Sequence, residues 1–466
     1  MLGRRCYAAL VPLMMGFIGL GGAIPLQPSL AAQTPDQAIP RDPLTAGTVR
    51  AADSIEIDSR VRKDVLDTLA RELESRYAIP DIANKLAAVV REKERASAYK
   101  NIRTAPEFAR VLTEDLFAVA HDKHLHVYFS FAPLPQGPPG LPPELRRMNG
   151  GISEVRILDG NVGYMKLYNV LPVELARDAV TAAFAFAHNT DALIIDNRDN
   201  GGGDPNTVAL YVSYLSEGKP YVVNTFHWRE GNRVEQFKTT DLGELAYGSR
   251  KPVFVLTGQG TFSGGEELSY DLQVLKRALI VGEVTGGGAN PGGPVPLGHQ
   301  FVVNIPSGQA INPVTGTSWE GVGVKPDIPV PAAGALSRAH RLAIERLSAV
   351  TADPLSRAML DAVAMKLETI EQAESGSVSR LANAELLGNY TPAVGGGTTV
   401  HILEKDGRLI RHIDGLADRE LIYLNGNRYR SAGLPDGFVI SFRTDQGKSE
   451  LLLEEPPRPS TIRVKQ

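Results

Sequence analysis

Residues 252–275 read PVFVLTGQGTFSGGEELSYDLQVL and predict a strand, a glycine-rich turn and a helix in direct succession. The apolar run 252–257 is typical of a buried strand, and 264–275 is typical of a helix. Ser263 stands at the junction, where the first N–H groups of a helix lack intrahelical partners. Those donors could stabilise an oxyanion, so Ser263 is a candidate nucleophile. The alternative is that Ser263 is an ordinary helix N-cap.

The sequence on both sides of this stretch alternates strand and helix patterns. Apolar strand candidates occupy 162–167, 192–195 and 279–281, and helix candidates occupy 173–188 and 205–215. Alternation of this kind predicts a parallel or mixed sheet covered by helices. We therefore expect a mixed βαβ core, and we place it at 151–335.

Different patterns flank the core. Residues 54–130 carry three amphipathic helix candidates, the third opened by a Thr104–Glu107 capping box, and a Pro/Gly-rich linker follows at 131–150. Residues 336–375 predict a helical connector. Short strands separated by turns such as Asp406-Gly407 then predict a small all-β domain at 376–466.

The N-terminal residues and the composition limit the class of protein. Two arginines followed by an apolar run and small residues predict a signal peptide at 1–32, with a flexible leader at 33–53. We therefore expect a periplasmic or secreted bacterial protein without a stable membrane span after cleavage. The single cysteine, Cys6, lies in the signal, which excludes a disulfide scaffold and a thiol nucleophile in the mature chain. A net charge of −4 without a basic block gives no sign of nucleic-acid binding, and no metal or cofactor motif is visible.

Three further segments contain glycine-rich loops with acidic residues. IIDNRDNGGG at 194–203 leaves the end of a predicted strand, where ligands of α/β sheets bind. EVTGGGANP occupies 283–291, and WEGVGVKPD occupies 319–327. Each of them alone predicts only a turn.

In this order, the four segments resemble the C-terminal-processing (tail-specific) serine peptidase family over roughly residues 55–335. The resemblance is greatest to the branch that includes interphotoreceptor retinoid-binding protein and the tricorn core protease, in which a three-helix bundle precedes a crotonase/ClpP-like core. Many members carry a PDZ module between these parts, but residues 131–150 are too few for one.

The resemblance implies which residues act. Ser263 matches the nucleophile, His124 the general base and Glu320 the carboxylate that orients the histidine. Backbone N–H groups of Gly264 and of Gly201 or Gly202 would bind the oxyanion. The rivals are His121 and His126 for the base, Glu283 for the carboxylate, and Lys276 for a serine–lysine dyad.

Two functions are compatible with these features. The first is an exported serine endopeptidase that cleaves polypeptides, with substrate C-termini as one expected region of cleavage. The second is a non-catalytic binding protein for an apolar ligand on the same fold, because a fold alone does not settle function.

Overall fold

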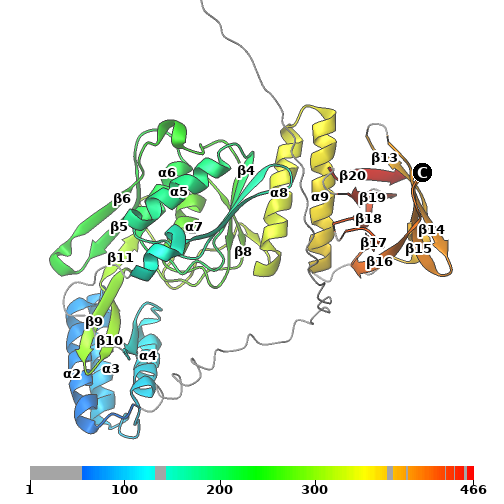
Figure 1. Ribbon diagram of the computed structural model, residues 1–466. Coiled ribbons are helices and arrows are strands. Elements are labelled where there is room, and N and C mark those ends of the chain that lie inside the picture. Colours follow the sequence, from blue (N-terminus) through cyan, green and yellow to red (C-terminus); the bar gives the residue numbers. More distant parts are fainter. Residues whose placement is uncertain are drawn as a thin grey trace, which may run out of the picture. The chain divides into compact units, whose positions relative to one another are not determined.

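The computed structural model (Figure 1) describes the chain from residue 55 onwards with short gaps. The described ranges are 55–131, 143–374, 381–394, 397–435, 437–445, 447–455 and 459–466. The predicted signal peptide at 1–32 and leader at 33–53 lie outside these residues.

A six-stranded mixed sheet forms the centre of the core. In spatial order its strands are β12 (Ile328–Pro329), β8 (Leu279–Gly282), β7 (Val253–Thr257), β4 (Ala192–Asp196), β3 (Val162–Leu167) and β2 (Ile152–Leu158). All neighbours are parallel except β2 and β3, which form a hairpin. The mixed βαβ core that the sequence predicts is therefore confirmed.

Helices cover both faces of this sheet because its strands are apolar on both sides. The helices are α5 (Val173–Ala187), α6 (Pro205–Tyr214) and α7 (Gly264–Val274) on one face, and α8 (Ala335–Val350), which is followed by α9 (Pro354–Glu374), on the other. Leu193 and Ile195 of β4 pack in the first layer, and Ile194 packs in the second. This alternation follows from the two-residue period of a strand.

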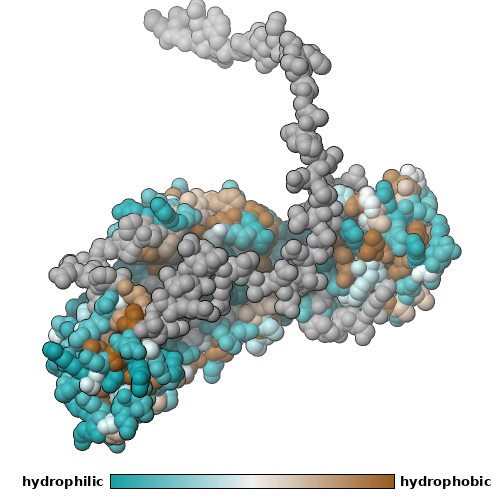
Figure 2. All heavy atoms as spheres, turned by 60° about the horizontal axis from the view of Figure 1, so that its bottom comes forward, coloured by the Kyte–Doolittle hydropathy of each residue, from teal (hydrophilic) through white to brown (hydrophobic). Residues whose placement is uncertain are grey.

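The N-terminal helices form their own core. They are α2 (Ser59–Arg76), α3 (Pro80–Arg95) and α4 (Ala105–Ala120), followed by β1 (His126–Phe129). Their apolar faces turn inward, and their outer face is mostly hydrophilic (Figure 2). The expected capping box is wrong in one respect: Thr104 is the N-cap residue of α4, but its side chain makes no capping hydrogen bond.

A hairpin from the middle of the chain completes the N-terminal unit. Strands β9 (Gly292–Gly298) and β10 (Phe301–Pro306) form a sheet with β1. Phe301 and Val303 of β10 are fully buried in the same hydrophobic cluster as the three helices. This hairpin, which joins residues 292–306 to the helices of 59–120, was not predicted from the sequence.

A second small sheet lies beside α6 and α7. Its strands in spatial order are β11 (Gly308–Ile311), β5 (Val222–Trp228) and β6 (Val234–Lys238), all antiparallel. Phe226 and Phe237 pack into the main core with their rings 4.7 Å apart. This sheet therefore packs beside α7, the helix that begins directly after Ser263.

The C-terminal region is a closed barrel of antiparallel strands, which confirms the expected all-β domain. The strands are β13 (Gly388–Pro392), β14 (Val400–Lys405), β15 (Arg408–His412), β16 (Arg419–Asn425), β17 (Arg428–Ser431), β18 (Val439–Asp445), β19 (Lys448–Glu454) and β20 (Thr461–Lys465). Leu452 on its outer side packs against Ala362 and Met365 of α9.

The remaining helical segments are short. They are α10 (Asn383–Leu386) and the 3₁₀ turns η1 (Pro143–Gly151), η2 (Glu230–Asn232), η3 (Gly243–Leu245) and η4 (Ala332–Gly334). Across the described ranges, no helix combines the length and the apolar character that crossing a membrane requires.

Candidate functional site

Ser263 occupies a strained backbone conformation between β7 and α7. Its φ of 51° and ψ of −123° are rare for a residue with a side chain. Such strain persists only where the surroundings enforce it, and it is common for nucleophiles on a strand-to-helix turn. The neighbouring N–H of Phe262 donates to Asn200 O at 2.9 Å, and Gly265 N–H donates to Phe262 O at 2.9 Å. The turn is therefore fixed on both sides of the serine.

Glu266 ties this turn to the loop that follows β8. Its buried carboxylate accepts hydrogen bonds from the N–H groups of Ser263 (2.9 Å), Gly287 (2.6 Å) and Gly288 (2.9 Å), and from the Thr285 hydroxyl. Burial raises the pKa of Glu266, and these hydrogen bonds lower it in part. Glu266 was not among the predicted site residues. Glutamate at the third position of a helix opened by serine is the pattern that could have found it.

His124 reaches the same region from the N-terminal unit, in the turn between α4 and β1. Its backbone N–H donates to Asp122 at 2.9 Å, and its carbonyl accepts from the Asn304 amide at 2.8 Å. The imidazole lies against the Phe262 ring, with centroids 4.6 Å apart. Its Nδ1 is buried and has no hydrogen-bond partner. Burial lowers the pKa of His124, so the ring is neutral near pH 7.

Glu320 and Asp122 both approach the imidazole. One oxygen of each carboxylate and one His124 nitrogen all lie within 4.8 Å of one another. Glu320 Oε2 accepts from Ala289 N–H at 2.6 Å and from Asn290 N–H at 2.9 Å. Burial and the nearby Asp122 raise the pKa of Glu320 to about 7. Burial and the charge of Asp122 both disfavour ionisation of Glu320 beside the His124 ring.

Asp122 was not predicted as a site residue. It is 1% exposed, and its second oxygen accepts from the Tyr77 hydroxyl at 3.1 Å. One imidazole and two carboxylates could also hold a divalent cation. However, both Asp122 oxygens already accept hydrogen bonds, as does one oxygen of Glu320, so we interpret the three groups as a proton-transfer cluster.

In the loop after β4, the glycine N–H group without a partner among the described residues belongs to a different glycine from the two that were predicted. The N–H of Gly201 donates to Tyr168 O at 3.1 Å, and that of Gly202 donates to Asn200 Oδ1 at 2.9 Å. Neither is free to bind an oxyanion, so the prediction for these two residues is wrong. Within the described part of the chain, the N–H groups of Gly203 and Gly264 have no partner. Their backbones touch, since a Cβ on Gly264 would lie 2.8 Å from Gly203 N.

The residues before these glycines hold the loop in place. Asp196 at the end of β4 is fully buried and forms an ion pair with Arg198 at 2.6 Å. The buried Asn197 amide donates to Gly265 O at 2.5 Å and to the Ser269 hydroxyl at 3.0 Å. Asn197 thereby fastens the glycine loop to α7.

The rival residues lie elsewhere. His121 caps the end of α4 and is exposed, and His126 is exposed and contacts the His124 carbonyl at 2.9 Å. Glu283 accepts from Ala332 N–H at 2.9 Å and does not enter the site. Lys276 follows the last turn of α7, about 20 Å from Ser263 at 1.5 Å per residue.

Ser263 and His124 open into one cavity of about 450 Å³. Its other lining residues are Gly203, Asp204, Pro205, Asn206, Phe226, Trp228, Glu235, Phe237, Gly264, Glu267, Ala289, Pro291, Gly292, Asn304 and Trp319. Because the two residues come from different units of the fold, packing between the N-terminal unit and the core assembles the site. A strained serine and a buried imidazole that line one cavity are the groups that a nucleophilic serine site requires.

Two family models match this chain. Residues 161–330 match peptidase family S41, and residues 50–149 match the N-terminal domain of peptidase S41 in eukaryotic IRBP. The chain belongs to peptidase family S41, which confirms the resemblance of the four motifs.

Two curated relatives and one solved structure are similar to parts of this chain. The carboxy-terminal-processing protease of Bartonella bacilliformis is 29% identical over 180 residues, which are 37% of this chain and 39% of the relative. Carboxyl-terminal-processing peptidase 2, chloroplastic, of Arabidopsis thaliana is 29% identical over 178 residues, which are 36% of this chain and 32% of the relative. The match thus spans well under half the length of these relatives. A proposed peptidase of Parabacteroides merdae has a crystal structure similar to 58% of this chain and 90% of its own, with 18% identity and a TM-score of 0.43.

Proposed function

We propose that this chain is an exported serine peptidase that hydrolyses internal peptide bonds of polypeptides, with Ser263 as nucleophile. The observation that carries the proposal is the strained Ser263 turn opening into the same cavity as the buried His124 imidazole. A helix N-cap needs neither of these features, because an ordinary N-cap serine has an extended backbone.

The mechanism follows from the positions of the groups. His124 is neutral near pH 7 and takes the proton of the Ser263 hydroxyl as that oxygen attacks the substrate carbonyl. The N–H groups of Gly203 and Gly264 donate to the oxyanion that forms. His124 then donates its proton to the leaving amine, and water repeats the sequence to release the acyl group.

Glu320 is the proposed partner of the charged imidazole. A carboxylate within 4.8 Å stabilises the imidazolium that exists only during the reaction. Asp122 is fixed by Tyr77 and adds to the same electrostatic effect. No metal or cofactor takes part in the proposed reaction.

A fluorophosphonate probe, which labels activated serines, tests the proposal. Wild-type protein should be labelled and should cleave an unstructured polypeptide, and Ser263→Ala should abolish both while the circular dichroism spectrum stays unchanged. Folded wild-type protein that neither reacts nor cleaves would refute it. The cavity also argues against the alternative of an apolar ligand carrier, because three carboxylates line it, those of Asp204, Glu235 and Glu267.

The export part of the proposal depends on residues 1–32. It predicts cleavage after the small residues near position 32 and activity in the periplasmic or secreted fraction. N-terminal sequencing of the mature protein from a bacterial host would test it, and an intact N-terminus in the cytoplasm would contradict it.

A further inference from the structure

A buried carboxylate without a full set of partners lines the cavity beside Ser263. Glu267 lies on α7 four residues after the serine, so its Cα is about 6 Å further along the helix on the same face. The residue is only 3% exposed, and its Oε1 makes no hydrogen bond. An unpaired buried carboxylate is costly, so a structure retains one only with a proton or a cationic partner.

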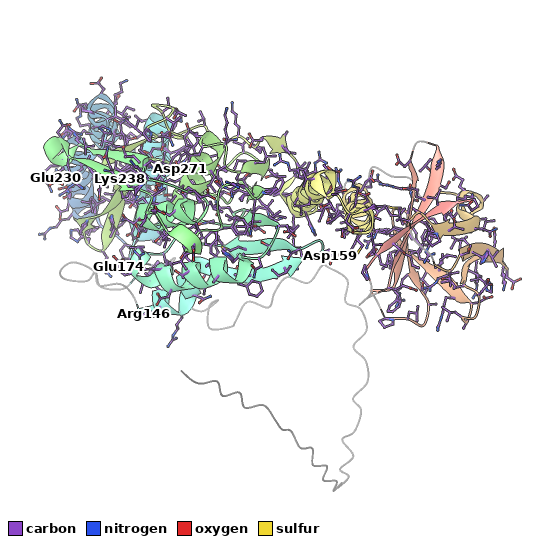
Figure 3. All side chains as sticks on the ribbon, turned by 90° about the horizontal axis from the view of Figure 1, so that it is seen from above. Arg146, Asp159, Glu174, Glu230, Lys238 and Asp271 are labelled. Carbon is purple, nitrogen blue, oxygen red and sulfur yellow. The ribbon has the colours of Figure 1, made fainter. Side chains whose placement is uncertain are left out.

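A second buried carboxylate follows Glu267 one turn later on α7. Asp271, one turn further along α7 and labelled in Figure 3, is 1% exposed, and its Oδ2 also has no partner. Its other oxygen accepts from the Asn312 amide at 3.0 Å. Burial and, after it, the charge of Glu267 raise the pKa of Asp271, and burial raises the pKa of Glu267 to about 7. Glu267 and Asp271 therefore either carry uncompensated negative charge or hold a proton, and a cationic group of a ligand could take the place of that proton.

The buried amide of Asn224 lies near Glu267 but does not provide its missing hydrogen bond. It is close enough to lower the pKa of Glu267, yet neither Asn224 Nδ2 nor Glu267 Oε1 makes a hydrogen bond. Glu267 Oε1, Asp271 Oδ2 and Asn224 Nδ2 are thus three buried polar atoms without hydrogen-bond partners in the described part of the chain, and Glu267 is the one of these residues that lines the cavity.

The walls of the cavity suit an alkyl chain with a cationic end. Phe226, Phe237 and Trp319 are buried aromatic residues, and Trp228 lies at their side. Aromatic faces favour the stem of a lysine or arginine and attract its charge. His124 is the only basic residue among those that line the cavity.

Of the other two carboxylates of the lining, Glu235 has a cationic partner and Asp204 has none among the described residues. Asp204 accepts hydrogen bonds from the N–H groups of Val173 and Asn206, which are neutral donors. Glu235 is paired with Arg233 at 2.8 Å. A substrate carboxylate, such as a free C-terminus, would find no lysine or arginine here to neutralise it.

We propose that this cavity binds the side chain immediately before the cleaved peptide bond, and that Glu267, backed by Asp271, selects lysine or arginine there. This inference rests on the proposed function, since Ser263 must attack the carbonyl next to that side chain. Glu267 lies about 6 Å along the helix from Ser263, a distance that the four-carbon stem of lysine spans.

The test compares fluorogenic peptides that differ only in the residue before the bond, lysine against norleucine, which has a similar linear stem without the charge. Wild-type protein should cleave the lysine peptide with the higher kcat/KM. Glu267→Gln should lower the lysine-to-norleucine ratio by about 30-fold or more, because removing one partner of a buried ion pair weakens binding by that order. The matched control is Glu230→Gln on the exposed turn between β5 and β6 (Figure 3), which should keep the wild-type ratio.

A second measurement needs no variant and covers the case in which Glu267→Gln does not fold. Butylammonium should protect Ser263 of the wild-type protein from the fluorophosphonate probe, and the neutral butanol should not. Equal protection by both compounds, or an unchanged peptide ratio in folded Glu267→Gln, would overturn the inference. In either case, cleavage of the norleucine peptide would leave the proposed peptidase function intact, whereas absence of any labelling and cleavage would refute both.

Discussion

Replacing Glu266 by glutamine should destabilise the protein and slow the reaction of Ser263 together. The Glu266 carboxylate accepts four hydrogen bonds, two at each oxygen. A glutamine keeps one oxygen and places an NH₂ group where two donors already point. Two hydrogen bonds are therefore lost in either orientation of the amide.

The magnitude follows from these contacts. A hydrogen bond to a charged group contributes about 1.5–3 kcal/mol, so two lost bonds amount to about 3–6 kcal/mol. Burial of the charge is itself unfavourable, as the raised pKa of Glu266 shows, and the neutral amide recovers part of that cost. We therefore expect the free energy of unfolding to fall by about 2–4 kcal/mol.

Urea unfolding at pH 7 measures the first effect, and the rate of fluorophosphonate labelling in folded protein measures the second. The labelling rate should fall at least tenfold, because the Ser263 N–H is one of the donors that Glu266 fixes. Glu174→Gln, an exposed acidic residue in the first turn of α5 (Figure 3), is the control and should change stability by less than about 1 kcal/mol. A Glu266→Gln protein within 1 kcal/mol of wild type that reacts at the wild-type rate would refute this reasoning.

Three further predictions concern the same site. Gly202→Ala should reduce labelling by about 100-fold or more, because the new Cβ would lie 2.6 Å from Gly264 N and 2.7 Å from Ser263 Cβ and would displace the proposed oxyanion donor Gly264 N–H. Gly201→Ala, whose Cβ meets only Asn169 Oδ1 at 3.7 Å, should react at the wild-type rate, and equal effects of the two substitutions would contradict this packing. The labelling rate should fall on acidification with a midpoint below pH 6.5, because burial lowers the pKa of His124 and the neutral ring is the base; a midpoint above 6.5 would argue against this role. Glu320→Gln should raise the free energy of unfolding at pH 8 by up to about 3 kcal/mol relative to its value at pH 4. In the wild type, a Glu320 carboxyl with a folded pKa of about 7 favours the native state fully below its ordinary pKa of 4.5. That contribution is lost as the pH rises through 7, and glutamine, which does not titrate, does not lose it. Denaturant titrations at both pH values test this, and an unchanged difference would show that Glu320 is not strained by burial.

Local pattern was sufficient for the regular elements of this protein. The four-residue spacing of Val61, Val65, Leu69 and Leu73 predicts α2, because those residues share one face of a helix. The apolar run after Pro252 predicts β7, and the serine at its end marks the start of α7. Such features depend on neighbours a few residues away, so the sequence displays them directly.

Strands whose partners are distant in sequence were harder to predict from the sequence. The hairpin at 292–306 contains glycine and proline and has little alternation, yet it completes the core of helices that precede it by about 200 residues. Its burial depends on the surface that α2, α3 and α4 present, and no local pattern encodes that surface.

The sequence by itself determined the family motifs, the order of the elements and Ser263 as the nucleophile candidate, because each depends on residue type and short spacing. Only the tertiary structure decided which glycine presents a free N–H, since a long-range bridge between Val170 and Gly203 sets the loop. It also separated two adjacent glutamates of α7. Glu266 meets four hydrogen-bond donors across the turn, whereas Glu267 meets a carboxylate and an open cavity, because successive helix positions point about 100° apart into different surroundings.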